Sequence, residues 1–386
     1  MLKMKKILVT SGAWQSSLAC IQSLGRRRHD VFLIDELQSS PINSRFCRSR
    51  IPSPAEKDED RYLEFLLNLV KTGSYDVLVP ISDSVVRYCS KHKKALERFI
   101  KMVLPDYDTL SLAADKDKLY AFAHKENIHI PKTYFPSDFL EVKKLAEKDI
   151  FPCVIKIPVS VAGKGVFYIN NKEELMRAYH SKTFDGQWPV IQDFVDGDFY
   201  GLTGLAFEGK LAMFFMYRTP RKYSMEGTPP ILFSVMDDVL LEQARGIISK
   251  LGWSGAINLD FLKDPQRGYV LLEVNPRFGG SLNFAYRMGI DLPWAYCQLA
   301  LGTKAQEIKQ PQYPQGTMFR TIFPTEIIRC CLQKGYWRTF VTNSFRLNCK
   351  TNVYWDDPGL LWGQMVETRW YWQDIKRMED GLGAAN

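Results

Sequence analysis

The first 110 residues alternate short apolar segments with amphipathic ones, and this alternation constrains the fold more than any other feature. The spacing predicts strands at residues 6–9, 30–34, 76–80 and 102–104, and helices at 15–24, 59–71 and 84–99. Strands and helices in strict alternation predict a parallel, doubly wound α/β sheet. The first turn, residues 10–16, could bind an anion at a helix N-terminus. It lacks the G-x-G-x-x-G pattern of dinucleotide-binding proteins, so a purely structural turn is favoured.

A second constraint lies near residue 265, where two apolar segments flank Asp264-Pro265-Gln266-Arg267-Gly268. Proline and glycine in this arrangement predict a hairpin. Glu273 and Asn275 then project to one face, and Arg277 follows if the strand continues. A four-residue loop, 265–268, would pair Asp264 with Tyr269 and place Asp260 opposite Glu273. A five-residue loop would turn Asp260 to the other face.

On one face, Asp260, Glu273 and Asn275 would offer two carboxylates and an amide oxygen. Such oxygens are the ligands that magnesium prefers when it carries substrate phosphates. The alternative is a solvated polar face with one salt bridge. Three adjacent apolar residues precede Glu273, which indicates a buried strand in which the carboxylates need partners. The pattern therefore favours a metal site.

The composition is that of a globular protein with room for two or three domains. The chain has 386 residues, of which 46% are hydrophobic and 24% charged. Its net charge of +8 suits a small anionic substrate better than nucleic acid, and no apolar stretch is long enough for a transmembrane segment. Eight scattered cysteines without a C-x-x-C motif are typical of a reducing compartment, so we expect a cytoplasmic protein. The basic and apolar start is interpreted as a first strand, because its apolar run is too short for a signal peptide.

Three lysines are candidates for binding an anion. Lys156 lies in the apolar strand 152–158, where it needs an anionic partner unless it lies at the sheet edge. Gly163-Lys164-Gly165 predicts a mobile flap whose backbone N–H groups can approach phosphates, although such hairpin tips are common. Lys118 lies in the first turns of a predicted helix at 116–126. The helix dipole disfavours a cation there unless a phosphate lies nearby. Exposed helical lysines are common, so Lys118 alone is a weak candidate.

Two further segments could contact a ligand. In residues 190–198 a strand runs into a linker, so the backbone of Gln192, Asp193, Phe194 and Val195 could pair with a purine edge, and Asp198 could accept from ribose hydroxyls. The alternative is an ordinary connection between strands. Arg218 and Arg221 open a loop after a predicted strand at 210–217; they are candidates for recognising an acid, or else members of a solvated charged loop.

In this order along the chain, these segments resemble the ATP-grasp superfamily over roughly residues 5–302. The superfamily includes the carbamoyl phosphate synthase large subunit, biotin carboxylase and many carboxylate–amine ligases. The most specific part of the resemblance is Asp260 with Glu273-x-Asn275-x-Arg277. Gly279-Gly280-Ser281 is similar to a motif common in carboxylate–amine ligases related to carbamoyl phosphate synthase.

The resemblance implies a Rossmann-like domain at 1–112 and an ATP-grasp domain of two α+β subdomains at 113–302. The aromatic content of residues 303–386 indicates a third, C-terminal accessory region. We expect that last region to form a packed layer, with docking of a carrier or a membrane surface as alternatives. Five of its residues are tryptophans: Trp337, Trp355, Trp362, Trp370 and Trp372. The expected partners are small-molecule substrates, and a homodimer is left open.

The resemblance also implies a role for each candidate residue. Lys118 and Lys156 resemble the lysines that hold ATP phosphates, and Gly163, Lys164 and Gly165 the glycine-rich flap. Gln192 to Val195 resemble the adenine hinge, although most relatives begin it with glutamate, and Asp198 stands where they place a ribose-binding glutamate. Asp260, Glu273 and Asn275 match the ligands of two Mg²⁺ ions, for which Mn²⁺ can substitute, with Glu273 bridging. Arg277 would hold the substrate carboxylate or the acyl phosphate.

The activity implied is ATP-dependent joining of a carboxylate to an amine through an acyl phosphate, with Arg277, Lys156 and Glu273 as catalytic residues. Two alternatives remain open from the residues alone. One is an acyl-phosphate-forming carboxylase or an enzyme similar to carbamoyl phosphate synthase. The other is a regulatory ATP-binding module without turnover, which the intact set of acidic ligands argues against.

Overall fold

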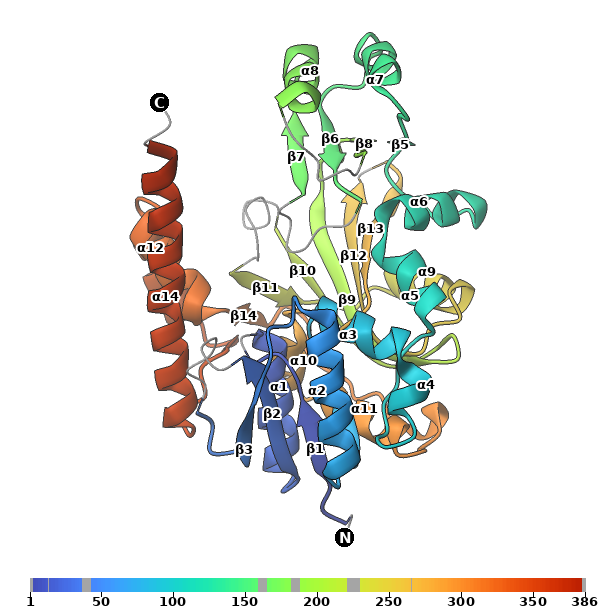
Figure 1. The fold of residues 1–386 in the computed structure, drawn as a ribbon. Coiled ribbons are helices and arrows are strands. Elements are labelled where there is room, and N and C mark those ends of the chain that lie inside the picture. Colours follow the sequence, from blue (N-terminus) through green and yellow to red (C-terminus); the bar gives the residue numbers. More distant parts are fainter. Residues whose placement is uncertain are drawn as a thin grey trace.

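The computed structural model describes residues 3–12, 14–36, 43–158, 165–181, 188–220, 230–264 and 266–383. Within these ranges the strands form three sheets, and Figure 1 shows the parallel sheet below the two antiparallel ones. A parallel α/β sheet followed by antiparallel sheets confirms the predicted fold class. No helix within the described ranges is both long enough and apolar enough to cross a membrane.

The strands are short in the N-terminal third and long in the centre of the chain. Their bounds are β1 Lys6–Val9, β2 Asp30–Glu36, β3 Ser49–Ser53, β4 Val77–Val79, β5 Thr133–Tyr134, β6 Cys153–Lys156, β7 Val166–Ile169, β8 Val190–Asp193, β9 Asp198–Phe207, β10 Lys210–Thr219, β11 Ile231–Ser234, β12 Gly255–Asp264, β13 Gly268–Asn275, β14 Met318–Arg320 and β15 Cys349–Thr351.

Helices connect and cover these strands. Their bounds are α1 Gln15–Arg26, α2 Glu59–Thr72, α3 Asp83–Lys91, α4 Lys93–Leu96, α5 Tyr107–Ala114, α6 Lys116–Lys125, α7 Phe139–Ala146, α8 Lys172–Ser181, α9 Asp238–Lys250, α10 Leu282–Arg287, α11 Leu292–Ala300, α12 Ile327–Leu332, α13 Tyr336–Ser344 and α14 Pro358–Gly383, with the short helical turns η2 Ala305–Glu307 and η3 Ile322–Glu326.

The N-terminal sheet is parallel, in the order β3-β2-β1-β4. The predicted strand at 102–104 is wrong. Lys101 forms a single bridge to Val77, and the backbone N–H of Val103 donates to the hydroxyl of Tyr296, not to a neighbouring strand. The edge strand β3 was missed because its sequence is polar and mostly exposed. The predicted helix at 84–99 divides at His92 into α3 and α4.

The other two sheets differ in size and are antiparallel, apart from the parallel pair of β14 and β15. The small sheet has the order β5-β8-β6-β7, and the large sheet has the order β13-β12-β9-β10-β11-β14-β15. Strands β9, β10 and β12 form the long centre of the large sheet. Because β14 and β15 extend this sheet, part of the C-terminal region completes the central fold.

The register of the β12–β13 hairpin differs from the predicted one at the turn and agrees with it farther on. Asp264 pairs with Gly268, whereas the four-residue loop predicted pairing with Tyr269. A β-bulge between Asp260 and Phe261 then shifts the register by one residue, so Asp260 lies opposite Glu273 as predicted. The extra residue is Leu272. The predicted alignment of the two carboxylates is therefore confirmed, but a bulge produces it.

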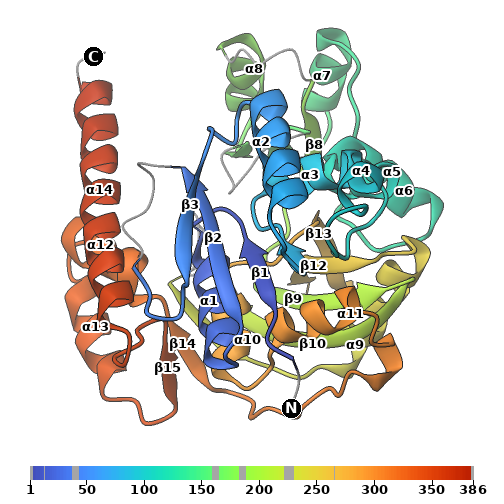
Figure 2. The same ribbon diagram turned by 60° about the horizontal axis from the view of Figure 1, so that its bottom comes forward.

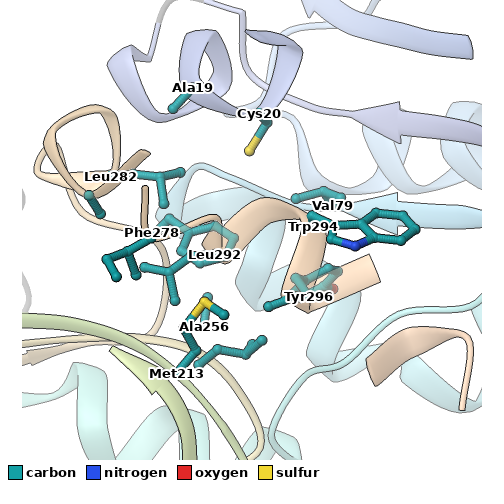
Figure 3. Packing of buried hydrophobic residues seen from close by; sticks show 14 of the residues in the cluster. Ala19, Cys20, Val79, Met213, Ala256, Phe278, Leu282, Leu292, Trp294 and Tyr296 are labelled. Carbon is teal, nitrogen blue, oxygen red and sulfur yellow. The ribbon is translucent and has the colours of Figure 1, made fainter. Parts of the chain in front are cut away.

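One hydrophobic core joins the parallel sheet to the rest of the chain. Figure 3 shows Cys20 of α1 and Val79 of β4 packed near Phe278, Leu292 and Tyr296. In Figure 2, α1 lies beside α10 and α11. The parallel sheet and the rest of the chain therefore meet through apolar side chains that belong to one core.

Tyr296 adds a polar link to this contact. Its hydroxyl accepts a hydrogen bond from the backbone N of Val103 at 3.0 Å and donates to the carbonyl of Leu78 at 3.1 Å. Both backbone segments belong to the N-terminal region, so one buried side chain connects this region to α11, which itself packs on β9 and β10.

Replacing Tyr296 with Phe should lower the free energy of unfolding by about 1–3 kcal/mol, because the buried N–H of Val103 loses its acceptor. Urea unfolding followed by circular dichroism measures this change. Tyr107→Phe is the control, since the structure gives that half-buried hydroxyl no hydrogen bond within the described part of the chain. Equal stability of the two variants would contradict the assigned role of the Tyr296 hydroxyl.

Candidate functional site

A cavity of about 430 Å³ lies between the small and large antiparallel sheets. Its size is in the usual range for a small-molecule site. The small sheet contributes Lys156 and Gln192, and the large sheet contributes Asp260, Glu273 and Asn275. Residues far apart in the sequence therefore meet in one cavity.

The hairpin places two carboxylates on the cavity wall. Asn258, Asp260 and Leu262 alternate along β12 and all line the cavity, as do Glu273 and Asn275 of β13. The amides of Asn258 and Asn275 donate to the two carboxylate oxygens of Asp260, at 2.8 and 2.9 Å. The prediction that Asp260, Glu273 and Asn275 share a face is confirmed. Asn258 was missed, although its position two residues before Asp260 indicated it.

Burial raises the pKa of Asp260 to about 8, and the negative charge of Glu273 contributes to the increase. Two facing carboxylates in a poorly solvated wall favour the binding of positive charge. A divalent cation would supply that charge and would return Asp260 to its ionised form.

The residues fit Mg²⁺ by their donor chemistry. Asp260 and Glu273 offer carboxylate oxygens, and Asn275, which donates to Asp260 through its nitrogen, can use its amide oxygen as a ligand. Within the described ranges, no group of three or more His, Cys, Asp and Glu residues could hold a metal unaided. Magnesium often takes its remaining ligands from substrate phosphates and water, which suits so small a set.

Two buried lysines face these carboxylates. The Nζ of Lys116 lies 3.4 Å from Glu273 Oε1, and the Nζ of Lys156 donates to the hydroxyl of Tyr120 at 3.1 Å. Burial lowers the pKa of Lys156 to about 8, although the charge of Glu273 partly offsets this effect. The Tyr120 hydroxyl donates to the carbonyl of Leu272 at 2.9 Å, so this network also holds the bulge residue.

Lys118 does not reach the cavity, contrary to the prediction. Its side chain is 60% exposed and its Nζ lies 3.3 Å from Asp115, the N-cap residue of α6. Lys116 lines the cavity instead. Residues two apart on a helix point in different directions, so only one of these lysines can face inward. The N-cap at Asp115 places both lysines in the first turn of α6, so no local signal separated them.

The segment predicted as a hinge lies along the cavity. Gln192, Asp193, Phe194 and Val195 all line it. The Gln192 side chain is buried and donates to Thr133 Oγ1 at 2.8 Å, so it supports β5. The walls nearby are apolar and are formed by Val154, Val166, Leu262 and Leu272. A flat apolar ring would fit between such walls.

Other predicted residues lie elsewhere. Asp198 and Arg218 form an ion pair at 3.3 Å and are absent from the cavity lining. Gly165 is buried just before β7, and its carbonyl accepts from Ile157 N at 2.9 Å. Gly163, Lys164 and Arg221 lie outside the described residues.

At the other end of the cavity, Arg277 connects the wall to the N-terminal domain. Its Nε donates to Asp83 of α3 at 2.8 Å, and its guanidinium carbon lies 4.7 Å from the ring centre of Trp14. Ser16 of α1 donates to the carbonyl of Gly279 at 2.9 Å. Helices α1 and α3 therefore help to hold Arg277 and the adjoining glycines, which also line the cavity.

Gly201 leaves space for the ring of Tyr217, which lines the cavity. It pairs with both Asp260 and Tyr217 across the sheet, and a Cβ at this position would lie 2.2 Å from the Tyr217 ring. The Tyr217 hydroxyl reaches Asn258 Oδ1 at 3.4 Å. A side chain larger than glycine would displace Tyr217 from this position.

Comparison with known protein families gives one match, to the family described as "ATP-grasp in the biosynthetic pathway with Ter operon", over residues 216–319. This range runs from the end of β10 into β14 and contains the β12–β13 hairpin.

Curated relatives are similar over half of the chain or slightly more. A formate-dependent phosphoribosylglycinamide formyltransferase of Prochlorococcus marinus is 23% identical over 200 residues, which are 50% of this chain and 49% of the relative. A carbamoyl phosphate synthase large chain of a Thermoanaerobacter species is 21% identical over 243 residues, 59% of this chain and 22% of the relative. The chain thus spans about half or less of the length of these relatives.

Among solved structures, an L-amino acid ligase from Bacillus licheniformis superimposes with a TM-score of 0.63. It is 16% identical, and the match covers 80% of this chain and 78% of the ligase. At this identity the likeness is one of fold.

The raised pKa of Asp260 predicts that the cation-free protein loses stability as pH rises between 3.8 and about 8. In that interval the folded protein keeps a proton on Asp260 that the unfolded chain has already released, so higher pH favours unfolding. Asp260→Asn should weaken this dependence. Urea unfolding at several pH values, with a chelator present, measures how the free energy of unfolding changes with pH in the wild type and in the variant. Equal slopes in the two proteins would contradict the prediction.

Proposed function

We propose, from the premise that this chain has the ATP-grasp fold, that it is an ATP-dependent carboxylate–amine ligase. It activates a small-molecule carboxylate as an acyl phosphate and joins it to an amine, with release of ADP and phosphate. The observation that carries the proposal is one cavity in which Asp260 and Glu273 face Lys116 and Lys156. Such a set of charges suits a polyphosphate bound together with a divalent cation.

In this proposal the nucleotide base lies between the apolar walls beside Gln192 to Val195. The triphosphate then extends toward Lys156 and Lys116, whose ammonium groups neutralise its charge. Lys116 takes the role that the resemblance implied for Lys118. Gly163, Lys164 and Gly165 remain the proposed flap, and Asp198 the proposed ribose contact.

Mg²⁺ is the proposed cofactor, in two ions held by Asp260, Glu273 and Asn275, and Mn²⁺ is an expected substitute. When bound, the ions would neutralise charge on the phosphate oxygens and align them for transfer. Asn258 supports this set from behind, because its amide orients one oxygen of Asp260.

Two steps follow from this arrangement. An oxygen of the substrate carboxylate forms a bond to the γ-phosphorus of ATP while the bond to the β–γ bridging oxygen breaks, which releases ADP. The amine nitrogen then attacks the acyl carbon, phosphate leaves with the electron pair of the C–O bond, and the nitrogen loses a proton. Arg277 would hold the carboxylate or the acyl phosphate, since it lines the cavity and Asp83 fixes its orientation.

The proposal also covers the residues that contact the acid, the cellular location and the binding partners. Arg218 and Arg221 stay candidates for contacting the acid. A cytoplasmic location suits the eight cysteines, all of which are free thiols. We propose small-molecule substrates and no nucleic acid, and a homodimer remains open.

The proposal is tested by measuring ADP release with Mg²⁺, ATP and panels of acids and amines. ADP should form only when both an acid and an amine are present. ADP release that requires bicarbonate and no other acid would instead indicate a carboxylase or a carbamoyl-phosphate-forming enzyme. Glu273→Gln should lower turnover by about 10²–10³-fold, because a charge-stabilising ligand is lost. Near-wild-type turnover in that variant would contradict the assignment of Glu273.

Lys116 and Lys118 provide a matched pair for testing nucleotide binding. Lys116→Ala should weaken Mg·ATP binding about tenfold or more, because the lost group is buried and charged. Lys118→Ala should leave the affinity nearly unchanged, since that side chain is exposed and does not line the cavity. Isothermal titration calorimetry measures the dissociation constant of Mg·ATP for each variant. A larger effect at Lys118 would reverse the assignment.

A further inference from the structure

The C-terminal region carries an exposed apolar face that the ligase reaction does not use. We define the C-terminal apolar face as Trp337, Val341 and Phe345 with Leu347. These side chains are 56%, 43%, 81% and 104% exposed. The sequence favoured a packed layer here, and the structure overturns that interpretation for this face.

The exposed residues lie on one stripe of α13 and the loop that follows it. Trp337 and Val341 are four residues apart, and Phe345 follows at the same interval, so they share one side of the helix. Tyr336 and Asn343 point to the opposite side and are buried. The helix therefore packs on the protein with one side and presents apolar side chains to solvent with the other. In Figure 2, α13 lies at the periphery of the molecule near α12.

Positive charge surrounds this face. Residues 327–355 contain no aspartate or glutamate and carry the following basic residues: Arg329, Lys334, Arg338, Arg346 and Lys350. Lys334, Arg338, Arg346 and Lys350 are exposed. Within α13, Arg338 lies directly beside the apolar stripe, and its guanidinium carbon is 5.7 Å from the Trp337 ring centre.

We infer that the C-terminal apolar face docks on a membrane surface that contains anionic phospholipid. Tryptophan, phenylalanine and leucine on one face, flanked by lysine and arginine, are the combination that binds at a lipid interface. The cations approach the anionic headgroups while the apolar side chains enter the boundary with the acyl chains. This binding is peripheral and requires no membrane-spanning segment.

The positive charge around the C-terminal apolar face and the protrusion of its side chains argue against a second copy of the chain or another protein as the partner. In a symmetric dimer the same face of each copy would meet its counterpart, so the cations of both copies would repel one another. Phe345 and Leu347 protrude almost completely, so a protein partner would need pockets for both. A bilayer needs only that they protrude.

The inference is tested by flotation of the full chain with phospholipid vesicles. The protein should float with vesicles of phosphatidylcholine mixed with phosphatidylglycerol, and much less with phosphatidylcholine alone. Raising the salt concentration should weaken the binding, because salt screens the headgroup charge. Failure to bind the anionic vesicles at low salt would overturn the inference.

Two variants separate the apolar contribution from the charge. Phe345→Ser combined with Leu347→Ser should lower the partition coefficient between vesicles and water about tenfold or more. The reason is that neither side chain would then bury apolar surface in the membrane. Arg338→Gln with Arg346→Gln and Lys350→Gln should remove the preference for anionic lipid. The control is Leu140→Ser combined with Val239→Ser, which changes side chains that are 58% and 70% exposed on α7 and α9.

All variants should keep the wild-type unfolding midpoint in urea, which shows that they fold. Flotation of the Phe345→Ser, Leu347→Ser protein at the wild-type level would overturn the inference. So would a dimer, detected by analytical ultracentrifugation, that this variant abolishes, because a second copy would then cover the face. These outcomes do not depend on ADP release and are therefore separate from a failure of the proposed reaction.

Discussion

The closeness of two carboxylates on one sheet wall is the interaction on which the site depends. Asp260 and Glu273 face each other across β12 and β13, where burial makes like charges costly, and the pKa of Asp260 rises as a result. Lys116, 3.4 Å from Glu273, offsets part of that charge. A cation bound beside the pair would relieve the remaining repulsion, which otherwise lowers the stability of the folded protein.

A single extra residue gives the wall this geometry. Without the bulge at Leu272, the register that begins at the turn would place Asp260 opposite Leu272. The Tyr120 hydroxyl binds the Leu272 carbonyl and accepts a hydrogen bond from Lys156. One network thus holds the bulge, orients a lysine of the small sheet and links α6 to both. The two sheets are connected through the groups that form the site.

Several site residues could be predicted from the sequence and others could not. The alternation along the hairpin identified Asp260, Glu273 and Asn275, because the side chains of a strand alternate between its faces. The sequence indicated Lys118, whereas Lys116 lines the cavity. Both lie in the first turn of α6, and only packing decides which of them faces inward. The sequence also did not indicate that Asp198 and Arg218 form an ion pair, because the pair depends on how β9 and β10 meet.

The sequence by itself determined most of the helices and strands, the fold class and the resemblance to the ATP-grasp superfamily, and the comparisons confirm the last two. These depend on periodicity and on short motifs, which act over a few residues. Only the tertiary structure decided the bulge at Leu272, the link from Arg277 to Asp83, and the exposure of the C-terminal apolar face. Each of these depends on contacts between distant segments or on their absence. A local pattern shows that a side chain is apolar or charged, but only packing determines what it meets.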